Sequence, residues 1–241
     1  MPSLPARRND TAGVALPKRL SVIADRIPEE GTVCDVGSDH ALLPLYLLKK
    51  DEDRRVVVTD IKPMPLSRAK VALMEANVAE RALFFLADGI PSEACDFISS
   101  YVIAGMSGET IAGILKAGET RIRLGQSFFL QPMSHEDVLR CFLYRSGYAI
   151  EEEVLVRENG RYFLIIVAVY AGRRAVRSPD PLQDAVGEYL PTHPVTWRKA
   201  YFQQKRAALI NVISKRRAAG VDSPAEENLL CRINEILEEL S

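Results

Sequence analysis

Short apolar runs of β type alternate with segments of helical spacing along most of the chain. Runs rich in Val, Ile, Leu and Phe predict five buried strands, at Val33–Val36, Arg55–Asp60, Ala82–Leu86, Asp96–Ala104 and Ser127–Leu130. Apolar residues at helical spacing predict helices at Lys18–Ile27, Ala41–Leu48, Leu66–Asn77, Glu109–Ala117 and Glu136–Ser146. Pro63 and Pro65 predict a loop before the third of these helices. Strands that alternate with helices in this way predict a Rossmann-like α/β sheet.

Two further β-type runs close this pattern, at Ile150–Arg157 and Arg161–Tyr170. The residues Glu158-Asn159-Gly160 join them, and Asn-Gly between β-type runs is a strong hairpin signal. Five parallel strands with a terminal antiparallel hairpin are typical of class I methyltransferases that use S-adenosylmethionine (SAM). Nicotinamide dehydrogenases usually close with a sixth parallel strand, so the hairpin disfavours them.

The sequence after the hairpin is helical in character. A polar, proline-containing segment, Gly172–Pro181, predicts a linker. Apolar spacing then predicts two helices, Thr196–Ala219 and Ala225–Leu240, joined by a Gly/Pro turn as a coiled-coil-like helical hairpin. The chain is thus expected to divide into a flexible tail, a methyltransferase domain and a helical arm, at residues 1–16, 17–172 and 173–241.

The composition fits a soluble globular protein, with 47% hydrophobic and 26% charged residues. A formal net charge of −1 predicts no partner by itself. Four scattered cysteines without a C-x-x-C pair argue against disulfides and structural zinc, and fit a reducing cytoplasm. No apolar run approaches the ~18 residues that span a bilayer, and the N-terminus lacks the apolar core of a signal peptide. We therefore expect a cytoplasmic protein without a metal site.

One stretch, Thr32–Pro44, has the form of a buried strand that turns sharply into a helix at a nucleotide-type pocket. It reads T-V-C-D-V-G-S-D-H-A-L-L-P, and Gly37 lets the backbone approach a ligand closely. Asp35 and Asp39 would repel a pyrophosphate, and one glycine stands where a dinucleotide fingerprint needs three. Acids in this loop are compatible with SAM, because SAM has no phosphate and its sulfonium is positively charged.

Acids also follow the second and third strands, at the sheet edge where ligands of open α/β sheets bind. Asp60 can accept from both ribose hydroxyls of an adenosine, or it can belong to a cap or turn. Asp88 can accept from an adenine amino group, or it can belong to a plain Asp-Gly turn. Asp39 can face the ligand or cap the next helix, and His40 can accept a proton or pack as a hydrogen-bonded histidine.

The small residues Gly105-Met106-Ser107-Gly108 follow the fourth strand, where methyltransferases of this architecture place the acceptor. The two glycines leave room for a flat base, although a small-residue turn before a helix would look the same. The Asp/Asn-Pro-Pro-Tyr/Phe motif, which enzymes that methylate exocyclic amino groups commonly use, is absent. Its absence favours a ring nitrogen or some other acceptor.

The first arm helix is strongly basic. From Val195 to Gly220 there is no acid, and Trp197, Tyr201 and Phe202 are interleaved with cations. A charge run is most often a solvated helix face, but a whole helix without acids favours a phosphate-binding surface. The cations are Arg198, Lys199, Lys205, Arg206, Lys215, Arg216 and Arg217.

Taken together, these motifs resemble the bacterial tRNA (adenine-N1)-methyltransferases of the TrmK type, which act on adenine 22 of tRNA. The matching stretches are K-R-L at 18–20, D-V-G-S-D-H-A-L-L-P at 35–44, I-A-G-M-S-G at 103–108, L-Q-P at 130–132 and E-N-G-R-Y at 158–162. The chain departs from the family pattern at Lys62-Pro63-Met64-Pro65, at Ser107 and at Gly187-Glu188.

The resemblance implies methyl transfer from SAM to N1 of an adenine in tRNA, with the arm helping to hold the tRNA. It implies a cofactor site made of Asp35, Gly37, Ser38, Asp39, Asp60, Ile61, Asp88, Gly89, Ala104 and Gly105. The candidate substrate contacts are Met106, Ser107, Pro132 and Tyr162 with the arm residues Arg198, Lys199, Lys205 and Arg206. The candidate catalytic residues are Asp39, His40 and Gln131, which could stabilise a cationic adenine or assist loss of its N6 proton.

Three other functions fit parts of the pattern. A SAM-dependent enzyme with another RNA or a small-molecule acceptor is one, although a small-molecule enzyme would have no use for a basic arm. A non-catalytic RNA-binding module with a degenerate SAM fold is the second, and the combination of Asp35, Gly37, Asp60 and Asp88 disfavours it. A nicotinamide oxidoreductase is the third, which the missing glycines disfavour. The expected partner is tRNA, and the protein is expected to be a monomer.

Overall fold

The computed structural model describes residues 14–38, 40–93, 96–172, 181–187 and 190–241. These residues form a seven-stranded sheet with the order β3-β2-β1-β4-β5-β7-β6. Its strands are β1 (Thr32–Val36), β2 (Val56–Asp60), β3 (Ala82–Leu86), β4 (Ile98–Met106), β5 (Ser127–Pro132), β6 (Tyr148–Glu158) and β7 (Arg161–Tyr170). Strands β1 to β5 are parallel, and β7 is antiparallel to β5 and β6. The predicted sheet with its closing hairpin is confirmed.

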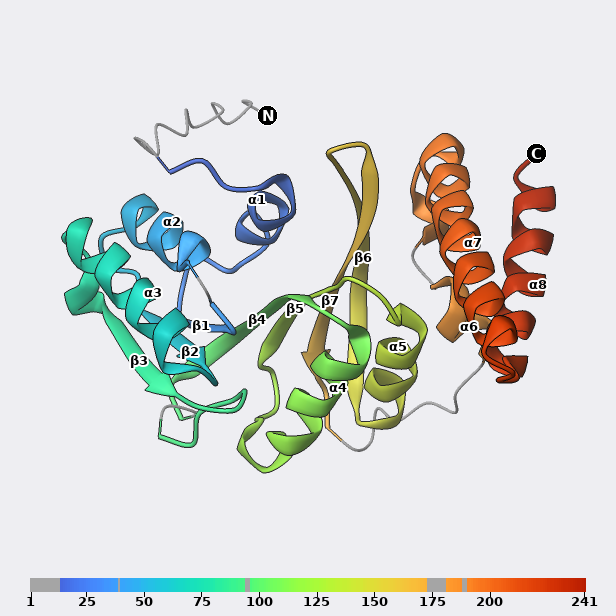
Figure 1. The fold of residues 1–241 in the computed structure, drawn as a ribbon. Helices are drawn as coiled ribbons and strands as arrows, with labels where there is room; N and C mark the ends of the chain where they lie inside the picture. The colour runs from blue at the N-terminus through green and yellow to red at the C-terminus, as the bar shows by residue number, and fades with distance from the viewer. Residues whose placement is uncertain (1–13, 39, 94–95, 173–180, 188–189) are drawn as a thin grey trace.

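Helices cover both faces of the sheet (Figure 1). On one face lie α1 (Lys18–Ala24), α2 (Leu42–Lys50) and α3 (Pro63–Glu75), which share a buried cluster with the sheet. On the other lie α4 (Gly108–Ala117) and α5 (Glu136–Arg145). The arm continues this second layer with the short α6 (Pro181–Val186) and the long helices α7 (Val195–Ala218) and α8 (Pro224–Glu239). The apolar faces of both layers pack on central strands that are buried on both sides, as expected for a parallel sheet.

One local prediction is wrong. Pro63 and Pro65 do not form a loop but lie in the first turn of α3. The first backbone amides of a helix have no partner within the helix, so a proline there removes no hydrogen bond and its fixed φ suits the start. The predicted flexible tail lies mostly outside the described residues, as do residues 173–180 of the predicted linker.

The hairpin of β6 and β7 extends beyond the end of β5 on the side of the arm (Figure 1). Pairing of β7 with β5 runs only from Ile166 to Val169, so the start of β7 has a backbone edge that β5 does not cover. Gln204 of α7 covers it: Tyr162 N donates to Gln204 Oε1 at 2.9 Å, and Gln204 Nε2 donates to Tyr162 O at 2.8 Å. This amide takes the place of a neighbouring strand and attaches the arm to the hairpin.

A buried ion pair also joins the arm to the domain. Arg140 of α5 and Glu153 of β6 are both fully buried, and Arg140 Nε donates to Glu153 Oε1 at 2.5 Å. Arg140 Nη1 donates to the backbone oxygen of Asp184 in α6 at 2.9 Å. Because neither charge can reach water, each depends on the other and on α6 staying in place.

Gly187 should be essential for this junction. Its φ is +81°, and a Cβ there would lie 2.3 Å from Glu153 Oε2 and 2.9 Å from Arg140 Nη2. We expect Gly187→Ala to lower the free energy of unfolding by more than about 2 kcal/mol, since it adds left-handed strain and displaces a buried ion pair. Gly220 has a φ of +70° but open space around it, so Gly220→Ala should cost only about 1–2 kcal/mol. Urea unfolding of both variants measures the difference; equal losses would contradict this role for the ion pair.

Candidate active site

The residues that follow the five parallel strands meet at one edge of the sheet. Backbone hydrogen bonds tie neighbouring strand ends together: Gly37 N donates to Thr59 O at 2.8 Å, and Ala87 N donates to Asp60 O at 3.0 Å. On the acceptor side, Met133 N donates to Met106 O at 2.8 Å. The predicted site residues that converge here are Asp35, Gly37, Ser38, Asp60, Ile61, Asp88, Gly89, Ala104, Gly105, Met106, Ser107, Gln131 and Pro132.

The turn after β1 passes close to the end of β4. Gly37 has a φ of +78°, and a Cβ on it would lie 2.2 Å from the terminal methyl carbon of Met106. Ser38 is buried, and its amide donates to Thr59 O at 3.3 Å. Asp39 lies outside the described residues, and His40 is exposed. Their catalytic roles stay predictions.

Asp35 is an acid in an unfavourable place for a charge. Burial raises the pKa of its carboxyl to about 6, against a smaller lowering by the hydrogen bond with Ser38. Near neutral pH the group is an anion that water solvates poorly. A cationic ligand at this edge would compensate for that missing solvation.

The raised pKa of Asp35 predicts an unusual pH dependence of the free energy of unfolding. The unfolded chain ionises this carboxyl near pH 4, so between about pH 4 and 6 the folded protein holds a proton that the unfolded chain has lost. The stability contribution of Asp35 should therefore be fully present below about pH 4 and be lost as the pH rises through about 6. Urea unfolding across this window should show that Asp35→Asn removes this decrease. A wild-type profile parallel to that of the variant would contradict the assignment.

Asp60 has the turn role that its position suggested, and its contact with a ribose stays a prediction. It is buried at the end of β2, and its Oδ1 accepts a hydrogen bond from Lys62 N at 2.8 Å, so it does shape the turn. Asp88, after β3, is exposed. Next to these acids, the side chains of Ile61 and Leu86 are 60% and 61% exposed. Two carboxylates beside exposed apolar side chains suit a nucleoside, with polar groups for the sugar and apolar surface for the ring.

The two glycines at the end of β4 and the start of α4 have different functions. Gly105 has a φ of +80°, and a Cβ on it would meet nothing within 4 Å, so it opens space at the edge. Gly108 instead allows close packing, because a Cβ there would lie 2.0 Å from the backbone oxygen of His135. Between them, Ser107 Oγ accepts from Thr110 N at 3.1 Å and caps α4. Substrate contact by Ser107 stays a prediction.

Gln131 is buried at the end of β5 and lies beside Ala104 in the sheet register. Its Nε2 donates to Pro132 O at 2.8 Å, and its Oε1 accepts from Arg19 Nη1 at 3.3 Å. Arg19 belongs to the K-R-L motif at 18–20, but the sequence did not identify it as a site residue. No spacing rule connects it to β5, since the two residues are distant in the chain.

The arm cations divide into two groups. Lys205 forms a largely buried ion pair with Glu136, in which Nζ lies 2.6 Å from Oε2. Burial lowers the pKa of Lys205, but the Glu136 carboxylate raises this pKa above its usual value. Lys205 therefore joins α7 to α5, a role that the sequence did not predict for it. Arg216 and Arg217 pair with Glu226 and Glu227 of α8. Among the described residues no acid pairs with Arg198, Lys199, Arg206 or Lys215.

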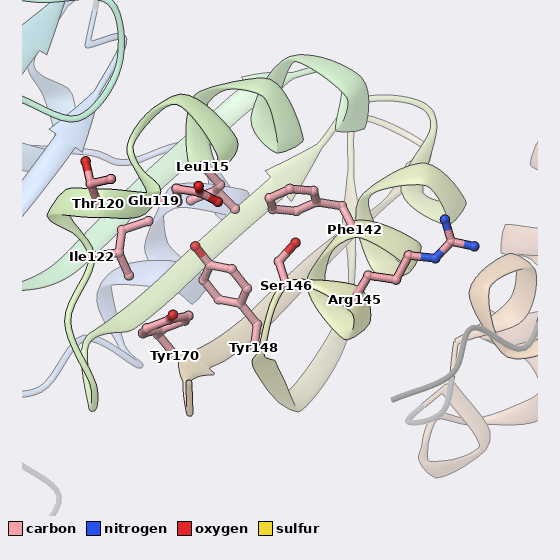
Figure 2. Close-up of a pocket in the computed structure, with 9 residues that line it drawn as sticks. All are labelled: Leu115, Glu119, Thr120, Ile122, Phe142, Arg145, Ser146, Tyr148 and Tyr170. Carbon is pink, nitrogen blue, oxygen red and sulfur yellow. The ribbon is translucent and has the colours of Figure 1, made fainter. Parts of the chain in front are cut away.

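A pocket of about 400 Å³ lies elsewhere, near the amino end of β5 (Figure 2). The rings of Phe142, Tyr148 and Tyr170 line it, together with Ser146, while the Arg145 guanidinium points away from the rings (Figure 2). It contains none of the predicted site residues. The carboxyl edge therefore remains the candidate active site.

The residues of that edge fit SAM by their chemistry. Gly37 has a positive φ that suits a close backbone approach, Asp60 is a buried carboxylate of the kind that can accept from ribose hydroxyls, and Asp35 is an acid whose anion a cationic ligand would stabilise. Within the described part of the chain, no cluster of three or more His, Cys, Asp or Glu side chains could hold a metal ion. None of the described helices is both long and apolar enough to cross a membrane.

Comparison with known proteins supports this assignment. Residues 16–166 match the protein family described as a methyltransferase domain. The tRNA (adenine(22)-N(1))-methyltransferase of Bacillus subtilis is 31% identical over 160 residues, 66% of this chain and 67% of that protein. The crystal structure of the B. subtilis M1A22 tRNA methyltransferase TrmK has a TM-score of 0.75 at 26% identity, and covers 95% of this chain and 98% of that one. A Streptococcus pneumoniae structure in complex with S-adenosyl-L-methionine has a TM-score of 0.74 at 25% identity, covering 92% and 100%.

The sheet order, the acidic edge and the domain match together define a methyltransferase with a Rossmann-like fold. More narrowly, the chain belongs to the family of bacterial tRNA (adenine(22)-N(1))-methyltransferases. The resemblance carried by the D-V-G-S-D-H-A-L-L-P and I-A-G-M-S-G motifs is confirmed.

Proposed function

We propose that this protein transfers the methyl group of SAM to N1 of adenine 22 in tRNA, giving 1-methyladenosine and S-adenosylhomocysteine. The observation that carries the proposal is the family membership of the chain. The acidic and glycine-lined carboxyl edge of the sheet, whose residues suit SAM, supports it. The proposed organisation is a catalytic domain over residues 17–172 and an RNA-binding arm over 173–241. The protein works in the cytoplasm as a monomer.

On the cofactor side, SAM supplies an electrophilic methyl on a positively charged sulfur. Asp60 binds the ribose hydroxyls through the carboxylate oxygen that does not accept from Lys62 N. Asp88 accepts from the adenine amino group, beside the exposed Ile61 and Leu86. Asp35 provides the negative charge near the cationic part of the ligand.

On the acceptor side, the open space at Gly105 receives the target adenine after it leaves the RNA stack. The N1 lone pair forms the new bond to the methyl carbon while the sulfur keeps the electron pair of the bond that breaks. The positive charge thus moves from sulfur to adenine. Holding adenine N1 in line with the methyl group of SAM can lower the activation barrier by on the order of 7–11 kcal/mol. The amide of Gln131 and the side chains of Asp39 and His40 are the groups proposed to stabilise the cationic product.

The arm provides the phosphate contacts, and the ion pairs limit their number. We expect Arg198, Lys199, Arg206 and Lys215 each to contact one phosphate. Each phosphate contact contributes ~0.7–0.9 to the slope of the logarithm of the tRNA binding constant against the logarithm of the salt concentration. Replacing all four residues by Gln should therefore reduce the magnitude of this slope by about 3. Filter binding at several salt concentrations measures this slope. The control replaces Lys49 and Lys50, at the end of α2, by Gln, and this variant should have the same salt slope as the wild type. An unchanged slope in the arm variant would show that the tRNA binds another surface.

The proposal is tested with two unmodified tRNA transcripts that differ only at adenine 22, which one keeps and the other has replaced by guanine. With labelled SAM, the first transcript should be methylated and the second should not. Equal labelling would place the modification elsewhere in the tRNA. Labelling of neither, with intact SAM binding, would favour a different acceptor.

A further inference from the structure

Arg19 of α1 joins three distant parts of the chain next to the acceptor edge. Its backbone amide donates to Glu158 Oε2 at 2.9 Å, and its Nε donates to Glu158 Oε1 at 3.1 Å. Its Nη1 donates to Gln131 Oε1 at 3.3 Å. The guanidinium carbon lies 4.4 Å from the centre of the Phe163 ring. The Nε contact to Glu158 and the ring contact to Phe163 orient the guanidinium, while the backbone amide of Arg19 holds the same carboxylate in place.

This orientation fixes the amide of Gln131. A guanidinium can only donate hydrogen bonds, so it selects the oxygen end of the amide. The nitrogen end then faces Pro132 O, to which it donates at 2.8 Å. Gln131 is buried and pairs with Ala104 in the sheet, directly before Gly105, where the register between β4 and β5 shifts. The Arg19 contact therefore sets the geometry of the wall that faces the acceptor space.

We propose that Arg19 is a positioning residue of the acceptor site, which with Glu158 holds the Gln131 amide and the turn after β5 in the geometry that receives the adenine. This inference rests on the proposed function. Arg19 acts through Gln131 and does not touch the reacting atoms. Glu158 has a second effect, since it neutralises a cation that would otherwise oppose the positive charge of methylated adenine.

Lysine is the informative substitution at this position. It keeps the positive charge and a long side chain, but a single ammonium cannot reproduce the planar fork that spans Glu158 and Gln131. In Arg19→Lys, we expect the turnover of tRNA to fall by about tenfold to a hundredfold, as for small misplacements of a reacting group. The dissociation constant for SAM and the melting temperature should stay close to those of the wild type.

Arg26 provides a matched control near the same helix. It follows α1 and makes two contacts to Glu152 of β6, with Nε to Oε2 at 2.8 Å and Nη2 to Oε1 at 2.9 Å. Like Arg19, it fastens this part of the chain to β6, but it has no contact with Gln131. Arg26→Ala should lower the melting temperature while turnover by the folded enzyme stays unchanged.

Single-turnover methylation of tRNA by wild type, Arg19→Lys, Gln131→Ala and the double variant tests the inference. If Arg19 acts through Gln131, the double variant should be no slower than Gln131→Ala alone. Wild-type turnover in Arg19→Lys, or losses that multiply in the double variant, would overturn the inference. If the wild type itself methylates no tRNA, the proposed function fails instead, so the two failures are distinguishable.

Discussion

Replacing Gly108 by alanine is expected to abolish most methyl transfer and to destabilise the fold. A Cβ at this position would lie 2.0 Å from the backbone oxygen of His135, and Gly108 N donates to Ser134 O at 2.7 Å. Neither contacting atom belongs to a flexible side chain, so the turns after β4 and β5 must move apart. We expect a loss of about 1–3 kcal/mol in the free energy of unfolding from overpacking. The displaced acceptor turn should lower turnover by about a hundredfold.

The control for this variant lies on the same helix. Gly113 of α4 has open space where a Cβ would go, so Gly113→Ala should stabilise the protein by about 0.5–1 kcal/mol and leave turnover unchanged. Thermal unfolding and single-turnover methylation of both variants separate helix propensity from the close contact. Wild-type turnover in Gly108→Ala would show that the two turns do not need to touch.

The second large effect is expected at Asp60. Asparagine keeps an oxygen that can accept from Lys62 N, so the turn after β2 should survive in Asp60→Asn. It removes the charge that strengthens the proposed ribose contact. Hydrogen bonds to charged groups contribute about 1.5–3 kcal/mol, so the dissociation constant for SAM should rise by about tenfold to a hundredfold.

Calorimetric titration of Asp60→Asn with SAM measures this rise. The control is Asp53→Asn, because Asp53 precedes β2 at the opposite end of the same strand and should not affect SAM binding. Unchanged affinity in Asp60→Asn, with an unchanged melting temperature, would leave Asp60 as a turn residue only.

Most of the sheet was predictable because its central strands are buried on both faces, β2 along its whole length, and the edge strand β3 is still a short apolar run. The run Ala82–Leu86 is a strand with the predicted ends, and the Asn-Gly turn places the hairpin of β6 and β7 correctly. Strand ends with Asp35, Asp60 and Gly105 then lie at one edge because the carboxyl ends of parallel strands always do. Pro63 was misread because a proline at the start of a helix and one in a loop look alike in sequence.

The missed features depend on contacts between residues far apart in the chain. Arg19 reaches Gln131 and Glu158 only because α1 packs beside the hairpin, which no local pattern encodes. Lys205 was expected at the RNA surface, since its spacing gives no sign that Glu136 lies 2.6 Å away. A count of cations in the sequence therefore overestimates the number that are free to meet phosphates.

The identity of the methylated nucleoside tests the central claim most directly. The protein should be incubated with labelled SAM and unmodified tRNA, and the digested RNA should be separated against reference nucleosides. The label should elute with 1-methyladenosine, with one S-adenosylhomocysteine formed for each methyl transferred. Label in any other nucleoside, or none in RNA that binds the protein together with SAM, would contradict the proposed reaction.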